Sequence, residues 1–132
     1  MKLRMDYVTN SSSVSYIITM HEGIVDCFLD FYQGYDAKAG TIRMAKALKK
    51  FMLENGNKNY MHGYELYTYL MTFADDDGDC LTKDILEEEG MNTDPLKMTE
   101  EELFNFIRGE YIHNMKMNEF FQGFGATQVK QY

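Results

Sequence analysis

The sequence predicts an α+β fold, a helix-dominated single domain with an N-terminal β-hairpin and four to five helices. The first twenty residues contain two short β-prone segments, whereas most of the remaining chain places its apolar residues at helical spacing. Only one proline occurs in 132 residues, which favours uninterrupted helices. This length, with a hydrophobic content of 45%, is sufficient for one domain with a buried core.

Residues 1–20 predict the hairpin. Lys2–Val8 and Val14–Met20 are rich in Val, Ile and Tyr, and they flank an uninterrupted polar run. Asn and Ser side chains in such a run bond nearby backbone amides and so stabilise a tight turn. An alternative interpretation treats the same loop as a binding site for a phosphate or nucleotide. The candidate ligand-binding residues are Thr9, Asn10, Ser11, Ser12 and Ser13.

The segment from Asp6 to Ile18, DYVTNSSSVSYII, resembles the D-[FY]-V-T-N-S-S-S-x-S-[FY]-I-I opening of a group of small proteins from Firmicutes and their phages. The resemblance covers about the first eighteen residues. The function of that group is unknown, so the resemblance implies a cellular setting and no activity.

The following segments predict three helices. The first is expected over Glu22–Tyr35, and the second over Ile42–Asn55 with Thr41 as its N-cap and Gly56 at its end. Tyr60–Ala74 predicts a third helix with little polar surface, which is typical of a central helix or of an interface. The residues expected to face the core from the first two helices are Ile24, Val25, Phe28, Leu29, Phe31, Tyr32, Met44, Ala45, Leu48, Phe51 and Met52.

The last third of the chain predicts two more helices and a tail. Leu81–Glu89 is a short helix with Thr82 as its cap, and Thr99–Glu102 is a capping box that opens a helix running to about Asn118. The weakly alternating tail, Ala126–Tyr132, is expected to add an edge strand beside the hairpin. The residues expected to face inward from the last helix are Leu103, Phe106, Ile107, Tyr111 and Met115. The resulting division of the single domain is 1–20 hairpin, 22–118 helical body and 119–132 tail.

Charge is distributed unevenly along the chain. Residues 75–102 contain twelve Asp and Glu against Lys83 and Lys97, although the whole chain carries a net charge of −8. One interpretation is a solvated face that keeps the protein in solution. The other is a surface that binds a basic protein, because a compact acidic face imitates the phosphates that nucleic-acid-binding grooves contact. With the phage-associated opening, this predicts an inhibitor of a nucleic-acid-binding protein.

The residues predicted to bind that partner are acidic, with two tyrosines as apolar anchors: Asp76, Asp77, Asp79, Glu87, Glu88, Glu100, Glu101, Tyr64 and Tyr67. An alternative is self-association, in which a basic stripe of Arg43, Lys46 and Lys50 meets the acidic segment of another copy. Direct nucleic-acid binding is disfavoured by the net charge.

No motif in the sequence predicts catalysis, a cofactor or a metal ion. Asp75–Asp79 fits no EF-hand register, and the three histidines have no metal-ligand spacing with each other or with the cysteines. Cys27 and Cys80 are expected to be reduced and at least partly buried, with Cys27 packed in the core. The absence of an eighteen-residue apolar run and of a signal-peptide pattern predicts a cytoplasmic protein without a membrane partner.

Overall fold

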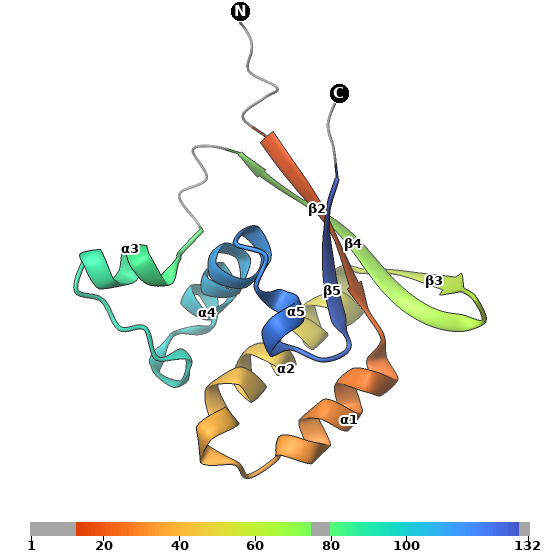
Figure 1. Cartoon of the computed structure of the whole chain (residues 1–132), viewed down its shortest axis with the longest axis horizontal. Coiled ribbons are helices and arrows are strands. Elements are labelled where there is room, and N and C mark those ends of the chain that lie inside the picture. Colours follow the sequence, from red (N-terminus) through yellow and green to blue (C-terminus); the bar gives the residue numbers. More distant parts are fainter. Residues whose placement is uncertain (1–12, 75–79, 130–132) are drawn as a thin grey trace, which may run out of the picture.

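The computed structural model places a four-stranded antiparallel sheet beside a layer of helices that covers one of its faces (Figure 1). It describes residues 13–74 and 80–129. In chain order the main elements are β2 (Ser13–Met20), α1 (Glu22–Tyr32), α2 (Ala39–Asn55), β3 (Asn57–Met61), β4 (Tyr64–Ala74), α3 (Lys83–Glu88), α4 (Glu100–Phe106), α5 (Met117–Phe120) and β5 (Phe124–Val129). The α+β class predicted from the sequence is confirmed.

The sheet has the strand order β3-β4-β2-β5. Ile18, near the centre of β2, lies opposite Tyr69 of β4 and Ala126 of β5. Tyr16, Ile18 and Met20 are buried under the helices, whereas Ile17 between them faces the other side and is 40% exposed. β5 pairs with β2, so the end of the chain joins the sheet beside the N-terminal strand, as its alternation predicted.

Two predicted segments fall wholly or partly outside the described residues. The first is the predicted hairpin, whose first strand, Lys2–Val8, and loop residues 9–12 are not described. The second is the aspartate run of residues 75–79. Val14–Met20, the predicted second strand, lies within β2.

The prediction of a helix over Tyr60–Ala74 is wrong. These residues form the end of β3 and all of β4, joined by a two-residue turn at His62 and Gly63 with φ of 54° and 81°. Positive φ at both positions is the geometry of a tight hairpin turn, and glycine is preferred there. Apolar residues occupy both faces of β4, which imitates the all-round apolar surface of a buried helix. The predicted helical body of residues 22–118 is therefore interrupted by a hairpin.

Helices α1 and α2 occupy the predicted regions with shifted ends. α2 begins at Ala39 after a 3-10 turn, η2 (Asp36–Lys38), so Thr41 lies inside the helix and is not its cap. Gly56 follows its last residue, as predicted. In α1 the outer flanks of the predicted apolar stripe do not reach the core, because Ile24 and Phe31 are 46% and 67% exposed.

The predicted helix to Asn118 is correct at its start and wrong in its continuation. The Thr99 capping box is present, and α4 follows it. The next residues form a π-helix, η4 (Ile107–His113). The helical conformation has ended by Met115, whose φ is 59°. Met115 is therefore exposed, and Met117 of α5 is buried instead.

The hydrophobic core lies between the sheet and the helices. Ile18 and Phe73 from the sheet, Leu48 from α2 and Ile107 from η4 are at most 1% exposed. No helix covers the opposite face of the sheet in the described part of the chain, and Leu70 there is 59% exposed (Figure 1).

Candidate functional site

The described part of the acidic segment, residues 80–102, contains α3 and the first turn of α4. Local interactions determine both ends of α3. The Thr82 side chain accepts a hydrogen bond from the Ile85 backbone N–H at 3.2 Å, as its predicted capping position requires. At the other end Gly90 has a φ of +69°, and the Met91 N–H donates to the Leu86 carbonyl at 2.8 Å. This is the Schellman ending of a helix. The Leu86 side chain is 1% exposed and attaches α3 to the core.

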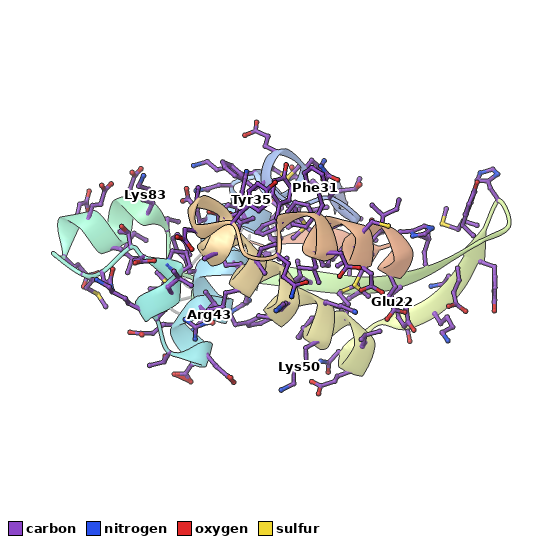
Figure 2. All side chains as sticks on the ribbon, turned by 90° about the horizontal axis from the view of Figure 1, so that it is seen from below. Glu22, Phe31, Tyr35, Arg43, Lys50 and Lys83 are labelled. Atoms are coloured by element: carbon purple, nitrogen blue, oxygen red, sulfur yellow. The ribbon has the colours of Figure 1, made fainter. Side chains whose placement is uncertain are left out.

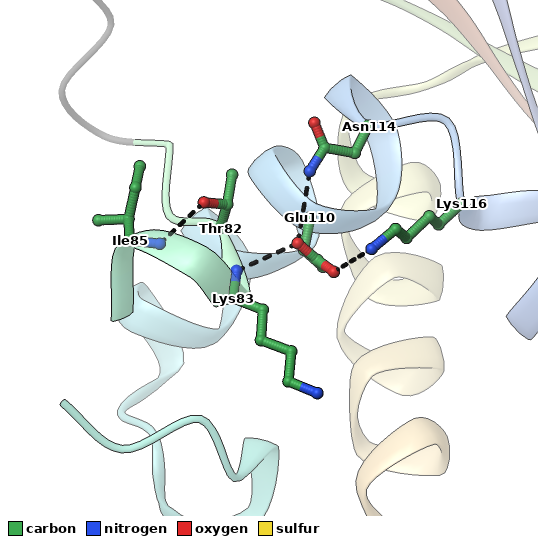
Figure 3. A network of polar contacts seen from close by, with 6 residues as sticks. All are labelled: Thr82, Lys83, Ile85, Glu110, Asn114 and Lys116. Atoms are coloured by element: carbon green, nitrogen blue, oxygen red, sulfur yellow. Dashed lines mark hydrogen bonds and ion pairs between the residues drawn. The ribbon is translucent and has the colours of Figure 1, made fainter. Parts of the chain in front are cut away.

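A buried carboxylate connects α3 to the helices behind it (Figure 3). Glu110 of η4 is 6% exposed and accepts a hydrogen bond from the backbone N–H of Lys83, the first residue of α3, at 3.1 Å. It also accepts from Lys116 at 2.6 Å and from Asn114 at 3.4 Å. Glu110 therefore ties the first turn of α3 to η4 and to the chain that leads into α5.

The protonation of Glu110 follows from these contacts. Burial acts to raise the pKa of its carboxyl, but the hydrogen bonds from Lys116, from the Lys83 backbone and from Asn114, with the charge of Lys116, outweigh that effect. The pKa therefore lies below its ordinary value, and Glu110 is a carboxylate at neutral pH. The same interaction raises the pKa of the Lys116 ammonium.

The chain entering α3 also lies directly against η4. The Leu81 N–H donates to the Asn105 carbonyl at 3.2 Å. A Cβ atom at Gly109 would collide with the Leu81 carbonyl oxygen, so this approach needs glycine at position 109. Together with Glu110, these backbone contacts hold α3 in a defined position.

Five glutamates form what we define as the acidic surface: Glu87 and Glu88 in α3, Glu89 directly after it, and Glu100 and Glu101 in α4. All five are exposed. None of them forms an ion pair within the described part of the chain. The neighbouring Glu102 differs, because its carboxylate accepts the Thr99 N–H at 2.9 Å in the capping box. The acidic surface thus carries unpaired charge on two fixed helices.

The other predicted partner-binding residues do not join this surface. Asp76, Asp77 and Asp79 lie outside the described residues. Tyr64 and Tyr67 belong to β4, whose hairpin with β3 extends at the end of the molecule opposite to α3 (Figure 1). Neither tyrosine therefore lies within the acidic surface.

Tyr64 and Tyr67 contact side chains close to the β3–β4 hairpin. Tyr64 is 63% exposed, with its ring centroid 5.9 Å from that of His21. Tyr67 is half-buried beneath the ammonium of Lys58.

The predicted basic stripe lines a groove between α2 and α4, which we name the cationic groove. Arg43, Lys46 and Lys50 form its α2 side, and the groove has a volume of about 400 Å³. Its other lining residues are Ala47, Phe51, Glu54, Glu100, Leu103 and Phe104. The groove therefore combines an apolar floor with three cations from α2, and it also contains the carboxylates of Glu54 and Glu100.

Glu110 was not predicted as a structural residue, although the sequence contains a signal for it. It follows Phe106 by four residues and Ile107 by three, so on a helix it shares their apolar face. An acidic residue on such a face requires buried partners. Asn114 stands four residues further, at the spacing of a contacting pair.

The cysteine and histidine predictions have mixed outcomes. Cys27 is exposed, so its predicted packing in the core is wrong; it lies on the α1 side that turns away from the sheet. Cys80 is half-buried, and neither cysteine forms a disulfide within the described part of the chain. In residues 13–74 and 80–129, no three His, Cys, Asp or Glu side chains gather as a metal site.

Among the described helices, none has the length and apolar content needed to cross a membrane. Comparison with family models, with curated proteins and with solved structures gives no significant match.

Proposed function

We propose that this protein is an intracellular protein-interaction module whose acidic surface binds a basic partner. The observation that carries the proposal is the set of five exposed glutamates that have no ion pair in the described structure. Unpaired charges contribute to recognition most when their positions are fixed before binding. Glu110, the Thr82 cap and the Thr99 capping box supply that fixation for α3 and α4.

The chemistry of the surface favours a partner that otherwise binds nucleic acid. Such proteins gain much of their affinity from Lys and Arg contacts to phosphates. A group of exposed carboxylates on fixed helices offers acceptors to the same Lys and Arg side chains and competes for the same groove. The proposed role is inhibition of such a protein in a phage or mobile-element setting, with no catalytic step. The phage-associated opening of the sequence supports this setting.

The test is capture of partners from a bacterial lysate by the tagged protein and by two charge-reversal variants. Glu87→Lys with Glu88→Lys removes part of the acidic surface, and lysine near the end of α3 suits the helix dipole. Asp36→Lys with Glu119→Lys is the matched control, since both residues are exposed and lie outside the surface. We expect a basic protein to be captured by the wild type and the control, and to be lost from the α3 variant.

Equal capture by the wild type and by both variants would overturn the assignment of the acidic surface. Thermal unfolding of each variant checks that the fold is retained.

A further inference from the structure

The three cations of the cationic groove differ in their contacts within the molecule. Arg43 donates to the Pro95 carbonyl at 2.5 Å, which holds its side chain at the end of the groove next to η3 (Pro95–Lys97). Lys46 and Lys50 have no ion pair among the described residues, whereas Lys49 between them is paired with Asp26 at 2.5 Å. Figure 2 shows Arg43 and Lys50 along the same side of the molecule.

The floor of the groove is apolar. The rings of Phe51 from α2 and Phe104 from α4 are in contact, with centroids 4.8 Å apart, and both are only partly buried. An occupant therefore needs an apolar side chain for the floor and acidic groups for the α2 side. Groove recognition of a helix commonly follows this pattern.

Helix α3 of this chain has the matching arrangement. Ile85 is 38% exposed, although it belongs to a helix whose Leu86 is buried. Glu88 and Glu89 follow it by three and four residues, so they share its side of the helix. Lys46 and Lys50 are four residues apart on one side of α2, so two cations stand beside the apolar floor, whereas Glu88 and Glu89 are adjacent in sequence and follow Ile85 on its side of the chain.

We propose that the cationic groove binds α3 of a second copy of this protein, with Ile85 on the Phe51 and Phe104 floor and Glu88 and Glu89 facing Lys46 and Lys50. The proposal rests on the proposed function in one respect, because it also uses α3 as a binding element. It adds that a copy of the chain competes with the basic partner for the same helix.

The net charge of −8 opposes association of two copies, so the local contact must overcome it. At about 0.15 M salt the Debye length is about 8 Å, and repulsion between distant charges is screened more strongly than the facing pairs. α3 and the groove are different patches of one molecule, so the contact is heterologous. The pair of copies then still has one free groove, on the copy whose α3 is bound, and one free α3, on the other copy.

This asymmetry allows a complementation test by sedimentation equilibrium at about 0.15 M salt. The groove variant is Lys46→Glu with Lys50→Glu, and the α3 variant is Glu88→Lys with Glu89→Lys. Each variant alone places like charges across the contact, so we expect its association to weaken at least about tenfold relative to the wild type. A mixture of the two places opposite charges across the contact again, since an intact α3 meets an intact groove, and we expect it to associate more tightly than either variant alone.

Controls separate this contact from general charge effects and from the proposed function. Lys97→Glu makes one charge reversal on an exposed lysine outside the groove, and its association is expected to equal that of the wild type, whereas Lys50→Glu weakens it. The groove variant keeps the acidic surface, so capture of a basic partner survives in it if the proposed function is correct. A wild type that remains monomeric, or a mixture that does not associate, would overturn the proposal and leave partner capture unaffected.

Discussion

At the scale of single residues, Glu110 makes the contacts that hold α3, the helix that carries Glu87 and Glu88 of the acidic surface. Its buried carboxylate accepts three hydrogen bonds, one of them from the first backbone amide of α3. A buried acceptor that loses its donors is costly, and so is a buried donor that loses its acceptor. The charge of Glu110 is therefore used to hold a helix, whereas the charges of Glu87 and Glu88 remain available to a partner.

Substitution of Glu110 by Gln keeps the shape of the side chain and removes the ion pair with Lys116. We expect Glu110→Gln to lower the free energy of unfolding by about 1–3 kcal/mol. Urea unfolding measures this, with Glu119→Gln, an exposed residue of α5, as a control that should change stability little. Equal stability of the Glu110→Gln protein and the wild type would show that the network does not hold α3.

The lowered pKa of Glu110 also predicts a pH dependence. A carboxyl whose pKa is lower in the folded state than its ordinary value of 4.5 stabilises the fold above that pH. The contribution is lost as the pH falls through the folded-state pKa. The stability difference between the wild type and Glu110→Gln is thus expected to be constant near neutral pH and to shrink below pH 4.5. A difference that grows on acidification would mean that the carboxyl pKa is raised.

At the scale of elements, local signals predicted the parts that depend on neighbours in sequence. The caps at Thr82 and Thr99 and the glycine after α2 are formed within a few residues, and they were predicted. The helix predicted over Tyr60–Ala74 is wrong because both faces of β4 carry apolar residues. Pairing with β2 and β3 determines the extended conformation of this segment. The wide turns of η4 depend on backbone hydrogen bonds, such as the one from the Lys116 N–H to the Tyr111 carbonyl. The pattern of side chains in the sequence does not predict such bonds.

The close contact between η4 and the chain before α3 gives a prediction for Gly109. Gly109→Ala adds a Cβ that meets the Leu81 carbonyl oxygen, so one of the two segments must move. We expect a loss of about 1–3 kcal/mol in unfolding free energy, as for other overpacked positions. Gly23→Ala in α1 is the control, because its Cβ meets only the movable side chain of His21. Similar stability of the two variants in urea would contradict the close approach of these segments.

At the scale of the whole molecule, the fold brings the acidic surface and the cationic groove next to each other at α4. The sequence predicted the acidic segment and the basic stripe, because both are runs or helical repeats in one stretch of chain. It did not predict that Glu100 of the acidic surface also lines the cationic groove, since that requires α2 and α4 to be packed together. The position of Tyr64 and Tyr67 also depends on packing between distant segments, because the sheet carries them to the opposite end of the molecule from α3 (Figure 1).

The most direct test of the acidic surface is the salt dependence of the affinity for the captured partner. Contacts between carboxylates and a phosphate-binding groove weaken as salt rises, because exposed charges are screened within about 4–5 Å near 0.5 M. We predict that affinity falls steeply between low salt and about 0.5 M for the wild type, and less steeply for Glu87→Lys with Glu88→Lys. An affinity that does not change with salt, or a slope that is the same in both proteins, would contradict binding through this surface.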